Sequence, residues 1–313
     1  MKYLLYLAPV LIFIAVTTFR QCNIDEFGSL SNPIKITFTP SVDAQSISNN
    51  AEKLIDFLEK ETGYYFTATF PTSYIAVVES FGSAKADVAI VNTFSYLLAQ
   101  QKFGAVARLR IIRHEGETTY RGQIVYNVDS GIEKLEDLNG KRIAYVAPSS
   151  TSGYILPHAL LEKNNIKPSE IIFANNHDIV ISQVYQGQVD AGATYYSPPD
   201  TKTGVFRDAR ERVVTQYPDV ADKVKILTLT DEIPNDPVIF RAGMPEDMMD
   251  DIVNALLKFV ATPDGQEALY QIYSVRGLTP TKDSDYDVLR EMLRQIGVDL
   301  EESVKETDKK SKK

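Results

Sequence analysis

Hydrophobic and polar positions along the chain alternate in short blocks that predict strands followed by helices. Residues 34–40, IKITFTP, have the β-branched and aromatic character of a strand. Across residues 46–63 apolar side chains recur at helical spacing, as at Leu54 and Leu58, and the pattern ends on Gly63. A strand and then a helix are therefore expected at the start of the folded part.

The same alternation continues through the middle of the chain. Further strands are predicted at 64–70, 86–91, 121–127, 141–147, 170–174, 189–194 and 223–230. Helices are predicted at 74–85 and 92–101, after the SSTSG stretch at 149–153, and at 178–187. Strands and helices that alternate at these lengths indicate an α/β protein with largely parallel sheets.

The N-terminal segment differs in kind from this pattern. Residues 3–19 are apolar and lead into Cys22, the only cysteine of the chain. Residues 1–22 are therefore expected to be a cleaved signal peptide, a lipoprotein signal acylated at Cys22 or an uncleaved anchor. Phe, Arg and Gln at 19–21 depart from the usual lipoprotein pattern, which weakens the lipid alternative. We expect an extracytoplasmic protein, tethered at its N-terminus and without an intrachain disulfide.

Composition and charge narrow the function. A chain of 313 residues, 44% hydrophobic, can bury a full core and suggests about two domains. A net charge of −9 argues against nucleic-acid binding, which needs clustered Lys and Arg. The basic tail at 307–313 contains no apolar residue and reads as a solvated terminus.

Small hydroxyl and amide residues gather where predicted strands meet predicted helices, at 39–41, 92–95 and 149–152. Ligands of α/β proteins sit at the carboxyl ends of strands, where helix N-termini present free N–H groups. A single Ser, Thr or Asn at such a place is explained as an N-cap. Three hydroxyl residues in a row before Gly153 exceed what one cap needs, so this stretch suits an oxyanion.

The segments 73–99, 129–166, 175–194 and 233–240 together resemble the phosphonate, phosphite and phosphate solute-binding proteins of ABC importers. The likeness extends over about residues 34–277. It implies a type II periplasmic-binding-protein fold, in which two α/β domains close around a ligand. The crossings between domains are then expected near Tyr120 and Leu229. This gives a discontinuous first domain, 33–119 plus 231–306, and a second domain, 120–230.

The resemblance also implies which side chains contact the ligand. They are the hydroxyls of Ser150, Thr151 and Ser152, the imidazole of His177, the phenols of Tyr74 and Tyr120, and the carboxylate of Asp236. Tyr195 and Tyr196 occupy a region that varies with the substrate in this family. They are expected either to form an aromatic wall around the substituent or to be ordinary surface or hinge aromatics.

Recognition by neutral groups is physically sufficient in this acidic protein. Oriented amides and hydroxyls hold an oxyanion without a salt bridge because their dipoles need little reorganisation. A carboxylate at Asp236 would repel a fully ionised ligand, yet it would accept a hydrogen bond from a protonated P–OH. We therefore expect selection against sulfate.

Two functions other than transport fit parts of the sequence. Ser150, His177 and Asp190 would form a Ser-His-Asp hydrolase set, but the sequence has no G-x-S-x-G elbow. A sensor that reports ligand occupancy to a membrane partner would keep the same binding domain. His114 and His158 lack the spacing of metal ligands.

The leading prediction is a monomeric solute-binding protein that delivers phosphate, phosphite or a small phosphonate to an ABC permease. It is expected to have no cofactor, no metal and no enzymatic activity.

Overall fold

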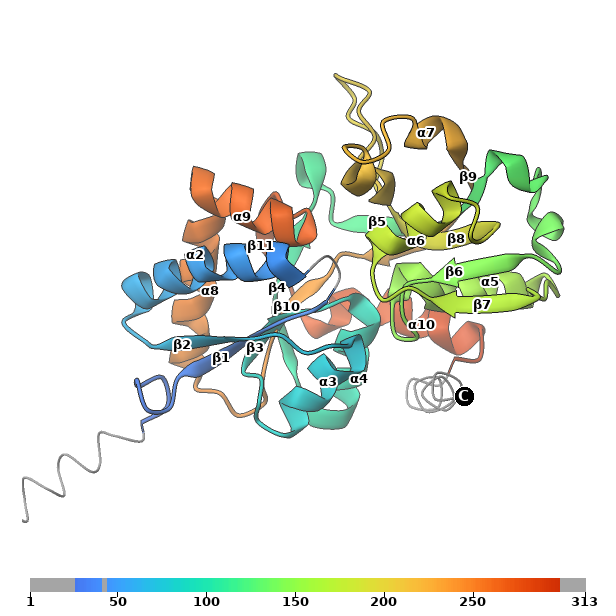
Figure 1. Cartoon of the computed structure of the whole chain (residues 1–313). Helices are drawn as coiled ribbons and strands as arrows, with labels where there is room; N and C mark the ends of the chain where they lie inside the picture. Colours follow the sequence, from blue (N-terminus) through green and yellow to red (C-terminus); the bar gives the residue numbers. More distant parts are fainter. Residues whose placement is uncertain (1–25, 41–43, 299–313) are drawn as a thin grey trace, which may run out of the picture.

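The computed structural model describes residues 26–40 and 44–298. The apolar N-terminal segment with Cys22 and the basic tail at 307–313 lie outside these residues, so what is expected of them stays a prediction. Within the described part the chain forms two α/β lobes, each built around one sheet (Figure 1). No helix in this part is both long enough and apolar enough to cross a membrane.

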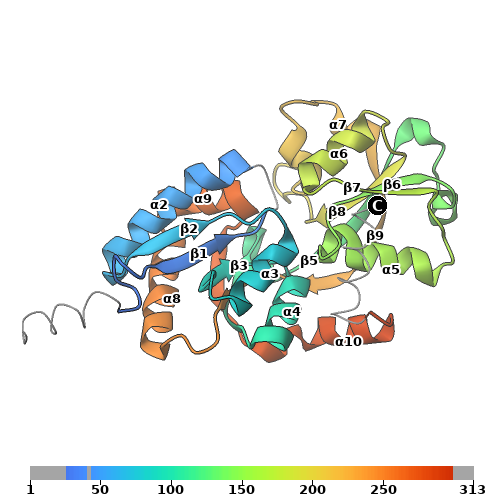
Figure 2. The same ribbon diagram turned by 60° about the horizontal axis from the view of Figure 1, so that its bottom comes forward.

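The first lobe contains a six-stranded sheet in the order β11-β4-β10-β3-β1-β2. Its strands are β1 (Ile34–Phe38), β2 (Phe66–Thr69), β3 (Val88–Ile90), β4 (Val106–Ile112), β10 (Pro237–Phe240) and β11 (Gly277–Pro280). Its helices are α2 (Ala44–Thr62), α3 (Tyr74–Gly82), α4 (Thr93–Phe103), α8 (Glu246–Val260) and α9 (Pro263–Tyr273). Figures 1 and 2 show α2, α8 and α9 on one face of this sheet and α3 and α4 on the other.

The second lobe contains a five-stranded sheet in the order β7-β6-β8-β5-β9. Its strands are β5 (Thr119–Asn127), β6 (Arg142–Tyr145), β7 (Glu170–Phe173), β8 (Ala191–Tyr196) and β9 (Val224–Pro234). Its helices are α5 (Leu156–Lys163), α6 (His177–Tyr185) and α7 (Val220–Lys223), with the π-helix η4 (Thr151–Ile155) leading into α5. The described part also contains short 3-10 helices, which are η1 (His114–Gly116), η2 (Val128–Ser130), η3 (Leu135–Leu138), η5 (Ala209–Val213) and η6 (Asp283–Tyr286).

The apolar positions that predicted the first helix do form its buried face. Ala51, Leu54 and Leu58 of α2 are buried in a core shared with α8 and α9. There the ring of Phe57 lies 5.1 Å from that of Phe259. Each fully buried leucine contributes about 1.5–3 kcal/mol of transfer free energy. The hydrophobic pattern therefore sets which face of α2 lies on the sheet.

The expectation of largely parallel sheets was wrong. Among the described strands the pairs β1–β2, β1–β3, β6–β7 and β6–β8 are parallel, whereas β3–β10, β4–β10, β4–β11, β5–β8 and β5–β9 are antiparallel. The strand that enters from the other lobe is β5 in the second lobe and β10 in the first. Each lies antiparallel between two strands that run in the same direction. A local strand-helix pattern carries no information about this insertion.

Two segments cross between the sheets, at 113–118 and at 235–236. Because β9 pairs with β5 as far as Pro234, the second crossing comes later in the chain than Leu229. The buried Asn235 joins the two crossings. Its backbone N–H donates to the carbonyl of Thr118 at 2.9 Å, and its side-chain amide donates to that of Glu117 at 2.8 Å. The crossing segments thus form one hydrogen-bonded waist.

The C-terminal helix α10 (Asp287–Gln295) makes a further connection between the lobes. It follows β11 of the first sheet, yet Met292 and Ile296 line a groove with Leu156 of α5 and Leu229 of β9 in the second lobe. Figure 2 shows α10 extending from the first lobe beneath the second. Residues of the expected first domain therefore contact both lobes.

Candidate functional site

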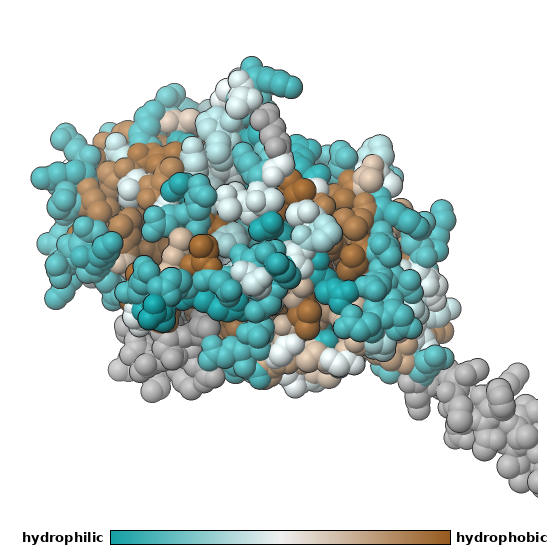
Figure 3. Space-filling model, turned by 180° about the vertical axis from the view of Figure 1, so that it is seen from behind, coloured by the Kyte–Doolittle hydropathy of each residue, from teal (hydrophilic) through white to brown (hydrophobic). Residues whose placement is uncertain are grey.

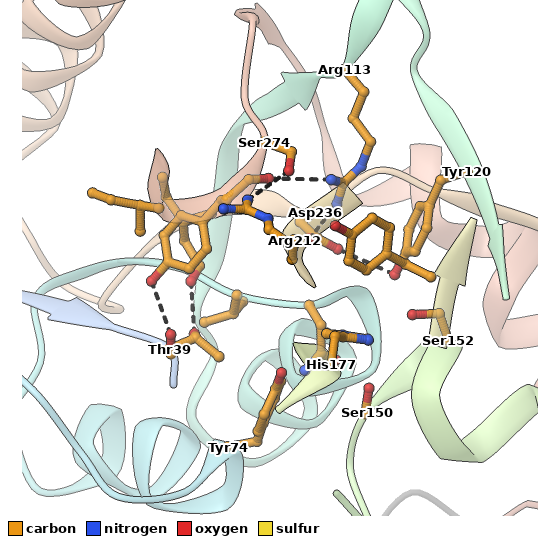
Figure 4. Close-up of a pocket in the computed structure, with 16 residues that line it drawn as sticks. Thr39, Tyr74, Arg113, Tyr120, Ser150, Ser152, His177, Arg212, Asp236 and Ser274 are labelled. Atoms are coloured by element: carbon orange, nitrogen blue, oxygen red, sulfur yellow. Dashed lines mark hydrogen bonds and ion pairs between the residues drawn. The ribbon is translucent and has the colours of Figure 1, made fainter. Parts of the chain in front are cut away.

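A cavity of about 60 Å³ lies between the lobes, at the ends of strands where helices begin. This volume has room for roughly four to six water molecules. Figure 4 shows Ser150 and Ser152 on one side of it and Thr39 and Ser274 on the opposite side. The lining residues are Thr39, Tyr74, Ile90, Val91, Asn92, Arg113, Tyr120, Ser150, Ser152, His177, Tyr195, Arg212, Asp236, Ile272, Tyr273 and Ser274.

The hydroxyl loop, residues 149–153, follows β6 and opens η4. Ser150 is the N-cap of this helix, and its Oγ accepts a hydrogen bond from the N–H of Gly153 at 3.2 Å. A Cβ at position 153 would lie 2.5 Å from Cγ2 of Val146, so only glycine lets the loop approach β6 this closely. Ser150 and Ser152 both line the cavity. The loop is therefore a cap and part of the cavity wall at once.

Thr151 is not part of the cavity wall. Its Oγ1 donates to Oδ1 of Asn92 at 3.0 Å and accepts from the backbone N–H of Phe94 at 3.0 Å. Asn92 is the N-cap of α4 in the first lobe. The middle hydroxyl of the loop thus joins the two lobes, and the structure gives it no direct place beside a ligand in the cavity.

His177 begins α6, after the N-cap Asn176. It lines the cavity, and its ring packs edge-on against that of Tyr195 at 4.9 Å between centroids. Burial, with the charges of Arg113 and Arg212, lowers the pKa of His177 to about 3. The imidazole is therefore neutral at pH 7. Its Nδ1 makes no hydrogen bond within the described part of the chain.

The two tyrosines at the end of β8 separate as strand geometry requires. Successive side chains of a strand point to opposite faces of the sheet. Tyr195 is buried and lines the cavity, whereas Tyr196 is partly exposed and is not in the cavity wall. Of the two, Tyr195 lines this cavity and Tyr196 does not, and contact of either ring with a substituent stays a prediction.

The first lobe contributes Tyr74, the first residue of α3, and Asp236, which lies just before β10. The Tyr120 hydroxyl of β5 donates to Oδ1 of Asp236 at 3.4 Å. Burial raises the pKa of Asp236 to about 6, although Arg113 and Tyr120 act in the opposite direction. Burial likewise raises the pKa of Tyr74 and Tyr120, so both phenols stay protonated and can donate to an anion.

Arg113 is a charged residue of the site that the neutral-recognition hypothesis missed. It is 6% exposed, and its NH2 group pairs with Oδ2 of Asp236 at 3.1 Å. Its guanidinium lies 4.9 Å from the ring centre of Tyr120 and 5.7 Å from that of Tyr195. Arg113 follows β4, which was not among the strands predicted from the sequence, so no predicted strand end pointed to it.

Arg212 of η5 is the second arginine in the cavity wall. Its guanidinium donates to the carbonyls of Tyr270 at 3.2 Å and Gln271 at 2.9 Å, and to Oγ of Ser274 at 2.7 Å. Those acceptors belong to the end of α9 in the first lobe, so this residue of the second lobe reaches across the cleft. The segment around Arg212 has no periodic hydrophobic pattern, so its position beside the cavity could not be predicted from the sequence.

Thr39, Asn92, Tyr273 and Ser274 also line the cavity. The first two belong to the hydroxyl and amide junctions that the sequence singled out, although neither was named as a ligand contact. Tyr273 and Ser274 end α9, for which no helix was expected. The Tyr273 hydroxyl donates to the carbonyl of Thr39 at 3.2 Å, which holds the end of α9 against β1.

The hydrolase set is not assembled. Asp190 precedes β8, and its carboxylate accepts from Nε of Arg142 at 3.2 Å and from NH2 at 3.0 Å. The ring of His177 instead packs on Tyr195. Within residues 26–40 and 44–298, no group of His, Cys, Asp and Glu side chains is arranged to hold a metal ion.

Comparison with solved structures confirms the fold class expected from the sequence. A binding-protein component of an ABC phosphonate transporter from Pseudomonas aeruginosa superposes with a TM-score of 0.72 at 20% identity, covering 84% of this chain and 86% of that one. PhnD1 from Prochlorococcus marinus, solved in complex with methylphosphonate, gives 0.70 at 15% identity and covers 84% and 98%. At these identities the likeness establishes a type II periplasmic-binding-protein fold.

Comparison of sequences establishes the family. The chain is 24% identical to the phosphonates-binding periplasmic protein of Escherichia coli K12 over 269 residues, which is 82% of this chain and 75% of that protein. It is 29% identical to the phosphate-import protein PhnD of Mycolicibacterium smegmatis over 175 residues, 52% and 54% of the two. The family model for periplasmic phosphonate substrate-binding proteins of ABC transporters matches residues 36–286. The chain therefore belongs to this family of extracytoplasmic transport components, which are substrate-binding proteins and not enzymes.

Proposed function

We propose that the protein captures phosphate, phosphite or a small phosphonate in the cavity between its lobes and delivers it to the permease of an ABC importer. The observation that carries this proposal is the cavity itself. Hydroxyls, phenols and two guanidiniums from both lobes converge on a space of about 60 Å³. This size fits a single phosphorus oxyanion with a small substituent.

The second lobe supplies neutral donors to the ligand. Helix N-termini leave backbone N–H groups without intrahelical partners, so those of Thr151 and Ser152 are available beside the hydroxyls of Ser150 and Ser152. Hydrogen bonds from such oriented donors to an anion are worth about 1.5–3 kcal/mol each. Neutral His177 adds a group that can donate or accept.

The first lobe and the waist supply the remaining contacts. The phenol of Tyr74 can donate to the oxyanion, that of Tyr120 can do so by giving up its long bond to Asp236, and Asp236 can accept from a P–OH group. Arg113 and Arg212 add the charge that an acidic protein needs in order to concentrate an anion at one place. Since contacts come from both lobes, ligand binding favours the closed arrangement through its extra bonds across the cleft.

The partner and the attachment belong to the same proposal. A monomeric binding protein delivers the ligand to a permease at the outer face of the membrane. Its N-terminal segment exports the protein if it is cleaved, or tethers it if it is acylated at Cys22. Figure 3 shows one face of the molecule with hydrophobic residues in separate groups among hydrophilic ones. On this face the hydrophobic groups do not join into the larger continuous patch that stable self-association favours, and the proposal keeps the protein monomeric.

A thermal-shift panel tests the ligand class. Phosphate, phosphite, methylphosphonate and sulfate are each added at increasing concentration. At a hundred times its dissociation constant a ligand adds about 2.7 kcal/mol to the free energy of unfolding. We expect this shift from at least one phosphorus compound and not from sulfate.

Variants connect the shift to the cavity. Ser152→Ala should weaken binding about tenfold or more, whereas Ser284→Ala, an exposed serine of η6, should leave it unchanged. The proposal fails if no phosphorus oxyanion shifts the transition, or if both variants behave like the wild type.

A further inference from the structure

We propose that Arg212, together with Arg113, makes this site select phosphorus oxyanions whose substituent carries no positive charge, so that aminoalkylphosphonates are excluded. This inference rests on the proposed function, since it concerns the same cavity. It follows from the charge of the wall, from the shortage of acceptors for an ammonium group, and from the place that Arg212 occupies.

The charges in the cavity wall do not cancel. Arg113, Arg212 and Asp236 are its charged groups at pH 7, because His177 is neutral. The Asp236 carboxylate is 3.1 Å from the guanidinium of Arg113, which balances it. Asp178 lies close enough to Arg212 to favour its charged form but does not line the cavity. Within the cavity wall, therefore, the charge of Arg212 is not paired with a carboxylate.

A ligand ammonium would find few free acceptors in this cavity. The Asp236 carboxylate already accepts from Arg113 at 3.1 Å and from Tyr120 at 3.4 Å, and the proposed function gives its remaining capacity to a P–OH group of the ligand. The carbonyls that end α9 would be a natural cation site, because the C-terminus of a helix carries partial negative charge. Of the acceptors there that line the cavity, the carbonyl of Tyr273 already accepts from Arg113 at 3.2 Å, and the hydroxyl of Ser274 accepts from Arg212 at 2.7 Å.

Arg212 therefore acts against a cationic substituent in two ways. Its charge repels an ammonium inside a space where solvent screening is weak. Its bond to the Ser274 hydroxyl also occupies an acceptor in the cavity wall that an ammonium would use. The three bonds hold the guanidinium in one position, so it cannot swing away to make room. Removing Arg212 should thus relax the selectivity and not only weaken binding.

Isothermal titration with matched pairs of ligands separates charge from size. Ethylphosphonate and aminomethylphosphonate have the same number of heavy atoms, as do propylphosphonate and 2-aminoethylphosphonate. The wild type should bind the neutral member of a pair at least a hundredfold more tightly. Arg212→Gln should reduce this ratio at least tenfold, whereas Arg212→Lys should retain most of it.

Arg294→Gln serves as the matched control, since Arg294 is exposed and pairs only locally with Glu291. It should keep the wild-type ratio. Equal affinity for the two members of a pair in the wild type would overturn the selectivity while leaving the proposed function intact. An unchanged ratio in folded Arg212→Gln would overturn the role of Arg212. Failure of every phosphorus compound to bind would overturn the proposed function as well.

Discussion

The hydroxyl loop and the charged cluster formed by Arg113, Arg212 and Asp236 face the same cavity but are built in different ways. The loop is a continuous stretch whose shape depends on β6 and on Gly153. The cluster brings together residues more than twenty positions apart, from both crossing segments and from η5. Local sequence specifies the loop, whereas only the complete fold specifies the cluster. Stability and binding should therefore respond differently when each is changed.

The largest effect is expected from breaking the cluster. Arg113→Met would leave the Asp236 carboxylate buried without its partner. Losing one member of a buried pair typically costs about 3–5 kcal/mol. Denaturant unfolding at pH 7 should show a loss of this size, and the double variant with Asp236→Asn should recover part of it. A loss within error of zero would mean that the pair contributes nothing to stability.

The pH dependence of Asp236 gives the next largest effect. Burial raises the pKa of this carboxyl from an ordinary 3.8 to about 6. The folded state therefore holds the proton more tightly than the unfolded state, so the contribution of this group to stability is present at pH 4 and is lost as the pH rises through 6. The free energy of unfolding of Asp236→Asn, relative to wild type, should increase by up to about 3 kcal/mol between pH 4 and pH 7. A relative stability that falls over this range would contradict the assignment.

Gly153→Ala tests the loop. The added Cβ would meet Val146 at 2.5 Å and the Ser150 hydroxyl at 2.8 Å, so the loop must move away from β6. Overpacking of this kind costs about 1–3 kcal/mol, and oxyanion affinity should fall with it. Gly140→Ala is not a suitable control because Gly140 has a positive φ. Ala159→Gly in α5 is the better reference: it should cost about 1 kcal/mol through helix propensity and leave binding unchanged.

The smallest effect is expected at the bridge between the lobes. Thr151→Val keeps the shape of the side chain but removes the hydroxyl that bonds Asn92 and the N–H of Phe94. The closed form should lose about 1–2 kcal/mol of stability. The affinity for every ligand should then fall by the same factor. Small-angle scattering should show a larger radius of gyration. Affinity that falls for one ligand and not for another would instead indicate direct contact with the ligand.

The same contrast explains what could be predicted from the sequence. Strands β1, β2, β3, β6 and β7 and helices α2 to α4 and α6 follow from local periodicity, and all were expected near their observed positions. Strands β4, β10 and β11 and helices α7 to α10 were not in the predicted series, and the antiparallel insertion of β5 and β10 depends on chain crossings that no local pattern encodes.

The site divides in the same way. Ser150, Ser152, His177, Tyr74, Tyr120, Tyr195 and Asp236 line the cavity, as the family resemblance suggested. Thr151 and Tyr196 do not line it. The hydroxyl of Thr151 bonds to the start of α4, and Tyr196 points to the opposite face of the sheet from Tyr195. The two arginines were missed because their positions depend on α9 and the waist, which are distant in sequence. Whether these side chains contact the ligand stays a prediction.

Hydrogen–deuterium exchange with and without a bound phosphorus oxyanion is the most direct test of the central claim, that one ligand is held by both regions at once. The probes are the amides of the hydroxyl loop and those at the end of α9, where Arg212 docks. With methylphosphonate or phosphate near saturation, exchange should slow in both regions, and Ser152→Ala should require more ligand to reach the same protection. Protection of only one region, or of neither, would contradict capture between the lobes.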